Sequence, residues 1–179
     1  MNYKAEIMDS DAVKRAIVRI SHEILEKTSG ADNVCLIGIK TRGTPLARRI
    51  SDNIEKFENK KVEVGEIDIT LYRDDVDVDE CDATVNSSDI NFDVTGKIVV
   101  LVDDVIFTGR TVHAAMDAVI SLGRPAAIRL AALIDRGHRE FPIRPDFVGK
   151  NLPTAKHEKV KVSLSEFDGA DSVKLYEQN

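Results

Sequence analysis

Hydrophobic and polar positions follow two different periods along the chain, and each period predicts a different kind of element. Apolar residues recur at three- and four-residue spacing over 11–27, which predicts an amphipathic helix. Asp9 or Ser10 is placed to cap this helix, and Gly30 to end it. We expect its buried stripe to consist of Val13, Ala16, Ile17, Ile20 and Ile24.

The rest of the pattern predicts strands that alternate with helices. Apolar runs or two-residue alternation indicate strands over 34–39, 62–71, 99–102, 126–134 and 159–164. Helical spacing covers 44–57, which begins with Pro45, and 112–122. Such alternation implies an α/β fold with a mostly parallel sheet and helices on both faces. We expect a single domain over residues 1–179.

One segment breaks this regularity. Residues 72–89 lack a steady period and contain seven acidic residues: Asp74, Asp75, Asp77, Asp79, Glu80, Asp82 and Asp89. We interpret the segment as a mobile acidic loop or an extended hairpin.

Composition narrows the class of protein. The 179 residues are 42% hydrophobic and 31% charged, and no apolar run approaches the roughly 18 residues of a membrane span. The N-terminus lacks a signal-peptide core, and Cys35 and Cys81 indicate neither a disulfide framework nor a metal site. We therefore expect a cytoplasmic protein. The net charge of −6 argues against a protein that coats nucleic acid, although a local basic patch is compatible with it.

The most informative stretch is 99–111, where an apolar run ends in Asp103 and Asp104 and a turn with Thr108, Gly109 and Thr111 opens a helix. A helix N-terminus offers unpaired N–H groups and a positive dipole to phosphate. Two carboxylates accept hydrogen bonds from vicinal hydroxyls. This order of parts predicts a site for a phosphorylated sugar. The alternatives are a plain strand-to-helix connection and a receiver domain whose aspartates hold magnesium, which leaves the threonine-rich turn without a role.

A second turn lies at the carboxyl end of the predicted strand 34–39. It contains Lys40, Thr41, Arg42 and Gly43. Its cations can neutralise a pyrophosphate, and its glycine permits a tight turn before the next helix. Taken alone, such a turn is equally compatible with a basic loop that faces solvent.

The stretch 99–111 resembles the phosphoribosyl-pyrophosphate (PRPP) motif of type I phosphoribosyltransferases. The resemblance implies that fold, with a small hood and a flexible loop beside the central sheet, and it implies Mg²⁺ as cofactor. Asp103 and Asp104 would hold the ribose hydroxyls or the magnesium's water shell. The nucleotide-binding residues implied are Thr41, Arg42 and Gly43 for pyrophosphate, with a non-proline cis peptide near 41–42, and Val105, Ile106, Phe107, Thr108, Gly109, Arg110 and Thr111 around the 5′-phosphate.

Segments 40–43, 66–75 and 135–140, with the late segment 143–154, closely resemble the PyrR family of pyrimidine operon attenuation regulators. That family implies a uracil phosphoribosyltransferase, which converts uracil and PRPP into UMP and diphosphate. The uracil pocket would lie beside Asp135, Arg136 and Gly137. Arg73, at the base of the acidic loop, would act on the leaving group when that loop closes.

The same resemblance implies a regulator that binds the leader mRNA of the pyrimidine operon in response to UMP or UTP. The RNA-binding residues implied are Arg15, Arg19, His22, Lys27, Thr41, His138, Arg139, Arg144 and Lys150. Val18 occupies this surface where relatives commonly carry threonine, which removes one hydroxyl contact. A homodimer or higher homo-oligomer is expected, with no DNA and no membrane as partner.

Two other functions stay open at this point. One is a phosphoribosyltransferase for another base, such as hypoxanthine or guanine, without a role on RNA. The other is a regulator whose enzyme site serves only as a nucleotide sensor.

Overall fold

The computed structural model describes residues 1–69 and 87–178. Along this part of the chain, strands and helices alternate through the middle, as the sequence predicted. The elements, in chain order, are β1 (Asn2–Met8), α1 (Ser10–Thr28), β2 (Val34–Ile39), α2 (Gly43–Glu58), β3 (Glu63–Asp68), β4 (Ser87–Asp89), β5 (Ile98–Ile106), α3 (Arg110–Leu122), β6 (Ala127–Asp135), β7 (Phe147–Asn151), β8 (Glu158–Ser163), α4 (Ser165–Asp168) and β9 (Ser172–Glu177).

The larger sheet has the strand order β4-β3-β2-β5-β6-β7. Its last five strands in that order are parallel, and β4 pairs antiparallel to β3 at the edge. The chain leaves β2 toward β3 and later returns to β5 on the other side of β2. The strand order therefore reverses between β2 and β5, and open α/β sheets bind ligands outside the carboxyl ends of their strands at such a point.

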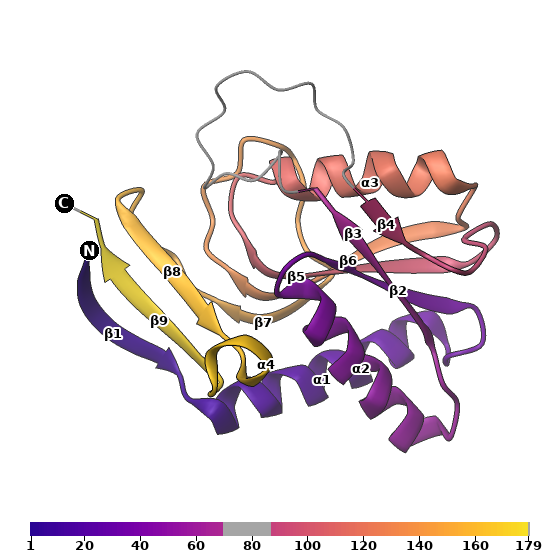
Figure 1. The fold of residues 1–179 in the computed structure, drawn as a ribbon, viewed down its shortest axis with the longest axis horizontal. Coiled ribbons are helices and arrows are strands. Elements are labelled where there is room, and N and C mark those ends of the chain that lie inside the picture. Colours follow the sequence, from indigo (N-terminus) through magenta and orange to yellow (C-terminus); the bar gives the residue numbers. More distant parts are fainter. Residues whose placement is uncertain (70–86, 179) are drawn as a thin grey trace.

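Helices cover both faces of this sheet, which confirms the predicted layers (Figure 1). α1 and α2 lie together on one face and α3 lies on the other. The five residues of the predicted α1 stripe are all buried, and Asp9 caps the helix by accepting a hydrogen bond from the Ala12 N–H at 2.8 Å. The strands β2 and β5 lie between these layers and are almost wholly apolar, because both of their faces are covered.

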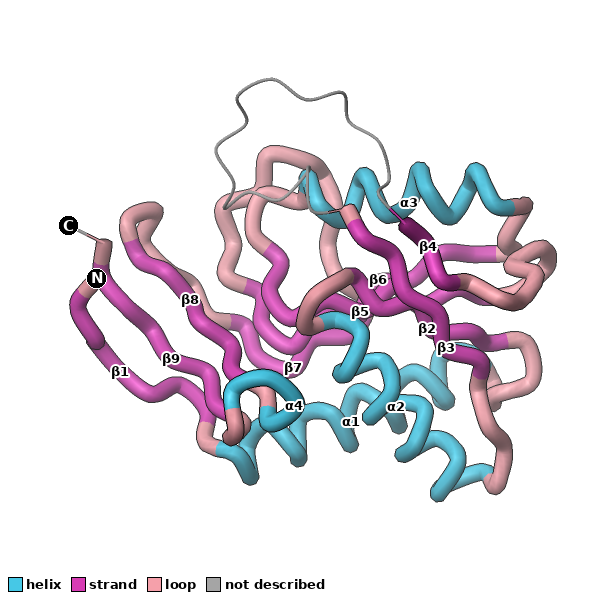
Figure 2. Tube along the Cα trace, viewed as in Figure 1, coloured by secondary structure: helices cyan, strands magenta, loops and turns pink. Residues whose placement is uncertain are grey.

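A second, three-stranded antiparallel sheet has the order β1-β9-β8 and lies beyond the carboxyl ends of the central strands, with α4 beside it (Figure 2). The sequence predicted only β8. The pattern missed β1, β9 and β7. β1 and β9 pair across the length of the chain, for example Asn2 with Glu177, and β7 has only five residues. This sheet occupies the place expected for the hood.

Part of the predicted acidic loop lies outside the described residues, which omit 70–86. The remainder is not a loop, since Ser87–Asp89 form β4 in register with Glu66–Asp68. The interpretation of the rest of the segment, which lies outside the described residues, stays a prediction. Within the described part of the chain, no helix has the length and apolarity that a bilayer span requires.

Candidate active site

The acidic pair, Asp103 and Asp104, lies near the carboxyl end of strand β5. The sequence predicted a strand that places two acids at its carboxyl end, and pairing with β6 continues past the apolar run as far as Ile106 opposite Asp135. Asp103 and Asp104 therefore lie within the strand, where the register with β6 skips Asp104. Asp103 is buried and Asp104 is half-buried. The Asp103 carboxylate accepts a hydrogen bond from the Asp104 N–H at 2.9 Å, which fixes its orientation.

The turn from β5 to α3 has the form expected of a phosphate cradle. Gly109 adopts φ +95°, a left-handed conformation that favours glycine, and α3 begins at the next residue. Thr108 is buried, and its Oγ1 accepts a hydrogen bond from the Arg110 N–H at 3.3 Å. The Thr108 carbonyl accepts two further bonds, from the N–H groups of Glu140 and Phe141. The loop after β6 therefore holds this turn in place.

Arg110 differs from the other members of that turn. Its guanidinium donates to the Glu140 carboxylate from Nε at 2.9 Å and from Nη2 at 2.6 Å, and it lies 5.5 Å from the centre of the Phe141 ring. The side chain thus faces the loop after β6.

The turn between β2 and α2 packs tightly against β5. A β-carbon built on Gly43 would lie 2.2 Å from the carbonyl oxygen of Val102 and 3.3 Å from the Cα of Asp103. One built on Gly38 would lie 2.4 Å from the Cα of Thr44. Glycine at both positions lets the start of α2 approach the acidic pair. The non-proline cis peptide joins Lys40 and Thr41, one residue before the expected position.

Two cations of this turn are held by carboxylates. Lys40 Nζ lies 3.0 Å from the Glu66 carboxylate, and this hydrogen bond raises the pKa of Lys40. Arg42 Nη2 donates to both carboxylate oxygens of Asp168, at 3.1 Å each. The Arg42 Nε is buried and has no hydrogen-bond partner among the described residues, and the same holds for Thr44 Oγ1. Thr41 is exposed.

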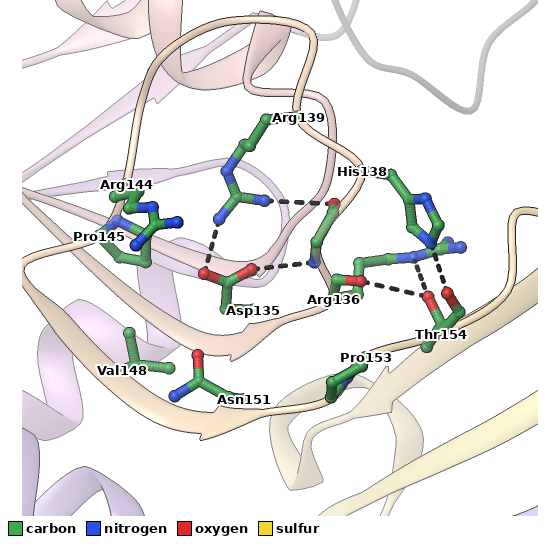
Figure 3. A pocket seen from close by; sticks show the side chains of 11 residues that line it. Asp135, Arg136, His138, Arg139, Arg144, Pro145, Val148, Asn151, Pro153 and Thr154 are labelled. Carbon is green, nitrogen blue, oxygen red and sulfur yellow. Dashed lines mark hydrogen bonds and ion pairs between the residues drawn. The ribbon is translucent and has the colours of Figure 1, made fainter.

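The loop after β6 contains the candidate uracil residues (Figure 3). Gly137 N–H donates to Asp135 Oδ1 at 3.0 Å, while Asp135 Oδ2 lies 2.6 Å from Arg139 Nη2. Arg136 is buried and donates to Thr154 Oγ1 at 3.1 Å and to the Glu158 carbonyl at 2.7 Å. Its guanidinium also lies 4.0 Å from the centre of the Phe107 ring. Arg136 therefore ties this loop to the segment that enters the smaller sheet.

A cavity of about 660 Å³ opens beside this loop. Figure 3 shows Asp135, Arg136 and Arg139 on one side of it and Asn151, Pro153 and Thr154 on the other. His138 and Arg144 also line it, so it combines candidate uracil residues with candidate RNA residues. Asp135 and Asn151 are paired in the sheet, which places the cavity over the carboxyl ends of β6 and β7.

The candidate RNA residues of α1 lie beside those of β7. Arg19 donates to the carbonyls of Val148 at 3.1 Å and Gly149 at 2.5 Å, and Lys27 lies 2.9 Å from the Asp146 carboxylate. His22 stacks on Phe57 with ring centres 4.0 Å apart. The exposed candidates are Arg15, Arg19, His22, Lys27, Thr41, Arg144 and Lys150.

Arg139 and His138 stand apart from this exposed set. The Arg139 guanidinium donates to the carbonyl of Phe107 at 2.8 Å and of Ile143 at 2.7 Å, besides its ion pair with Asp135. The His138 ring contacts the Thr154 carbonyl through Nε2, and His138 adopts φ +62°. Both side chains thus have structural partners, which lie in the loop itself, in the turn after β5 and in the segment after β7.

Two site features were missed from the sequence, and one predicted residue is not described. Asp168 contacts Arg42, in the turn proposed to bind pyrophosphate (residues 40–43, called the pyrophosphate turn below), from 126 residues away, and no local pattern marks such a contact. The stacking of Phe107 on Arg136 likewise depends on how two loops meet. Arg73 lies outside the described residues.

Comparisons with known proteins agree with this geometry. Residues 4–166 match the model of the phosphoribosyl transferase domain. The bifunctional protein PyrR of Thermoanaerobacter sp. (strain X514) is 60% identical over 178 residues, which cover 99% of this chain and 100% of that protein. The bifunctional protein PyrR of Clostridioides difficile (strain 630) is 57% identical, over 97% of this chain and 98% of that protein.

Solved structures show the same fold at low sequence identity. The hypoxanthine phosphoribosyltransferase of Trypanosoma cruzi matches with a TM-score of 0.74 at 15% identity, over 99% of this chain and 98% of that one. The hypoxanthine phosphoribosyltransferase of Staphylococcus aureus matches with a TM-score of 0.73, also at 15% identity, over 97% of this chain and 92% of that one. These likenesses confirm the type I phosphoribosyltransferase fold. The domain match and the near full-length identity to the bacterial proteins together show that this chain belongs to the PyrR family of phosphoribosyltransferases.

Proposed function

We propose that this chain transfers a phosphoribosyl group from PRPP to uracil, giving UMP and diphosphate, and that the nucleotide-bound protein binds the leader RNA of the pyrimidine operon. One observation carries the proposal. At the point where the strand order reverses, the acidic pair of β5 lies directly against the turn that begins α2. Such a crevice can hold a sugar phosphate at one loop and a pyrophosphate at the other.

The 5′-phosphate would sit at the turn of residues 107–111. The first N–H groups of α3 lack intrahelical partners, and the helix dipole favours an anion there. Gly109 allows the backbone to approach closely, and Thr108 and Thr111 add hydroxyl groups. Val105, Ile106 and Phe107 lead into this turn and are proposed to contribute to nucleotide binding, Ile106 through its backbone because its side chain is buried in the core.

The ribose and the leaving group would lie between Asp103–Asp104 and the turn of residues 40–43. The ribose carbon becomes positively charged as diphosphate leaves, and nearby carboxylates stabilise that charge. Thr41, Arg42 and Gly43 would bind the diphosphate. Since uracil attacks only when it is aligned with the same carbon, positioning accounts for much of the catalysis. Arg73 is proposed to reach the leaving group from the segment outside the described residues.

Mg²⁺ is the proposed cofactor, and the residues present fit it. The described residues contain no cluster of three or more metal-ligating side chains, so this part of the chain does not supply a complete cage for an ion. Magnesium in phosphate chemistry is commonly held by one or two carboxylates together with substrate oxygens and water. Asp103 and Asp104 supply that minimal set. When bound with PRPP, Mg²⁺ would neutralise the departing diphosphate.

Uracil is proposed to bind beside Asp135, Arg136 and Gly137. Its alternating carbonyl and N–H groups match backbone as well as side-chain partners. The hydrogen bonds of Arg136 to Thr154 and Glu158 would hold this loop at a fixed distance from the smaller sheet. A fixed opening of this kind selects for the size of the base.

The enzymatic proposal is tested by incubating the protein with PRPP, Mg²⁺ and each of uracil, hypoxanthine and guanine. Formation of UMP alone supports it. Formation of a purine nucleotide without UMP would support the other-base alternative. If UMP binds but no base is converted, the chain is a nucleotide sensor and the enzymatic proposal fails.

RNA binding is supported by the side-by-side arrangement of α1 and β7. Their exposed cations can contact phosphates, and His22 or an arginine plane can stack on an unpaired base. Thr41 belongs to both the pyrophosphate turn and the proposed RNA surface, so it is placed to couple the two sites. We propose that the protein acts in the cytoplasm as a homodimer or higher homo-oligomer.

Coupling between the sites must be reciprocal. If UMP tightens binding of a pyrimidine-operon leader hairpin, the same RNA must tighten UMP binding by the same factor. Filter binding with and without UMP, together with UMP titration with and without RNA, measures both factors. Equal UMP affinity in the presence and absence of RNA would remove the proposed switch.

A further inference from the structure

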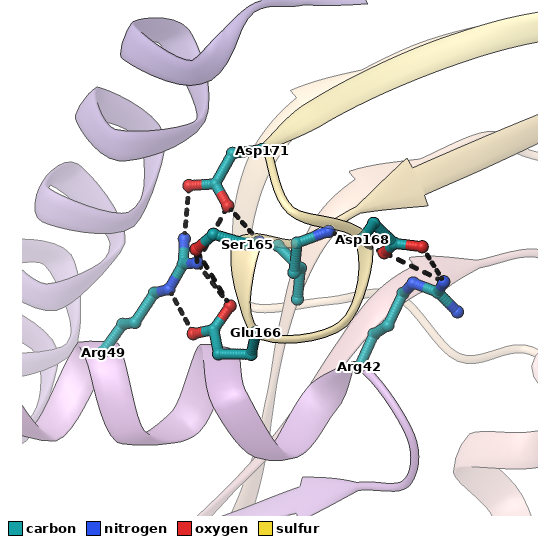
Figure 4. Close-up of polar contacts among 7 residues, drawn as sticks. Arg42, Arg49, Ser165, Glu166, Asp168 and Asp171 are labelled. Carbon is teal, nitrogen blue, oxygen red and sulfur yellow. Dashed lines mark hydrogen bonds and ion pairs between the residues drawn. The ribbon is translucent and has the colours of Figure 1, made fainter.

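The described structure brings a carboxylate of α4 onto the arginine of the pyrophosphate turn (Figure 4). Arg42 Nη2 lies 3.1 Å from Oδ1 and 3.1 Å from Oδ2 of Asp168. Both side chains are mostly buried, with 28% of Arg42 and 23% of Asp168 exposed. An arginine side chain has many rotamers, and an ion pair in a partly buried setting restricts them.

Asp168 is itself held rigidly. Its Oδ2 accepts a hydrogen bond from the Leu164 N–H at 2.9 Å, which closes the single turn of α4. The rest of α4 is fastened to α2 through Arg49. That guanidinium donates to both carboxylate oxygens of Asp171, at 2.7 and 2.9 Å, and to those of Glu166, at 2.8 and 2.6 Å.

The two arginines thus have different surroundings: Arg42 immediately precedes α2, and Arg49 lies within it. Arg49 has all of its described hydrogen bonds to side chains of 165–171. Arg42 uses one nitrogen, Nη2, for Asp168, and its Nε is buried. Among the described residues, the Nη1 group of Arg42 has no hydrogen-bond partner. Arg42 belongs to the pyrophosphate turn. Because the guanidinium is planar, a carboxylate that holds Nη2 in place also sets the direction in which Nη1 points.

We propose that Asp168 is a positioning residue for the transfer reaction, which holds the Arg42 guanidinium in the orientation that binds the diphosphate of PRPP. The inference rests on the proposed function, because it assumes that the turn of residues 40–43 binds diphosphate. On this proposal α4, which lies beside the smaller sheet, contributes to PRPP binding. Ordering Arg42 before PRPP arrives lowers the entropic cost of binding.

The test uses Asp168→Asn in the full-length protein. Asparagine keeps the size of the side chain and an oxygen for the Leu164 N–H, but it removes the charge that holds Arg42. We expect KM for PRPP to rise about five-fold, as does the inhibition constant of diphosphate, while kcat and KM for uracil stay within two-fold. Glu166→Gln is the matched control on the same short helix, since Arg49 keeps its two bonds to Asp171, and it should leave KM for PRPP unchanged.

A double-mutant cycle separates positioning from a general loss of structure. In an Arg42→Ala background, Asp168→Asn should have no further effect on KM for PRPP. Additive effects of the two substitutions, or an unchanged or lower KM for PRPP in Asp168→Asn, would overturn the inference. A wild-type protein that binds no diphosphate in calorimetry would instead contradict the proposed function, so the two failures are distinguishable.

Discussion

Gly43 lies so close to Val102 that no side chain fits between the start of α2 and strand β5. A β-carbon at Gly43 would be 2.2 Å from the Val102 carbonyl oxygen, a separation that requires the backbone to move. This contact joins the two halves of the proposed site, because Val102 immediately precedes Asp103. The distance between the pyrophosphate turn and the acidic pair is thus set by a backbone contact.

Gly43→Ala is therefore expected to disturb both the fold and the site. Forcing a methyl group into a packed contact costs about 2 kcal/mol of unfolding free energy, and the shift of α2 should raise KM for PRPP. Urea unfolding and initial rates measure the two effects. Arg48→Ala, on the exposed side of the same helix, is the control and should change neither. Wild-type stability in Gly43→Ala would show that this contact is not a constraint.

Asp104→Asn tests the acidic pair. The substitution keeps the shape of a half-buried side chain but removes the charge proposed to stabilise the ribose carbon. We expect kcat to fall about 100-fold, while circular dichroism and the melting temperature stay close to those of the wild type. Asp117→Asn on the exposed face of α3 is the control. A wild-type rate in Asp104→Asn would exclude the residue from catalysis.

Arg15 and Arg19 should differ in their effects on RNA binding and on stability. Arg15 is exposed on α1, so Arg15→Gln should reduce the dependence of RNA affinity on salt by about one phosphate contact, without loss of stability. Arg19→Gln should weaken RNA binding too, but it also removes the bonds to the Val148 and Gly149 carbonyls and should lower the melting temperature. Filter binding over several salt concentrations measures the first effect. Unchanged RNA retention in both variants would remove α1 from the RNA surface.

The Arg49 cluster should make part of the stability depend on acid pH. The hydrogen bond from Arg49 lowers the pKa of Asp171 in the folded state. A lowered folded pKa means that the contribution is present above the unfolded value of about 3.9 and is lost as the pH falls through the folded value. Asp171→Asn should therefore cost about 1 kcal/mol at neutral pH, and this cost should be smaller at an acid pH below the unfolded value of about 3.9. Urea unfolding at both pH values measures the difference. A gap that persists in acid would assign it to packing.

Local patterns in the sequence were sufficient for strands β2, β3, β5 and β6 of the larger sheet and for the helices that cover it, because each of these elements has its own period. The buried stripe of α1 and the apolar run of β5 are examples, and Gly109 marks the turn before α3 in the sequence. The smaller sheet was not predictable in this way, since β1 and β9 form only by pairing the two ends of the chain. For the same reason, the contact of Arg42 with Asp168 and the inward orientation of Arg139 depend on tertiary packing.

The central claim is that the site outside the carboxyl ends of β2 and β5 holds a ribose 5-phosphate, and a crystal structure of the protein with UMP tests it most directly. We expect the phosphate to lie within hydrogen-bond distance of the backbone N–H groups of residues 109–111, with the ribose hydroxyls at Asp103 and Asp104. A UMP phosphate bound instead in the cavity between Arg144 and Thr154, with the α3 N-terminus unoccupied, would contradict the account.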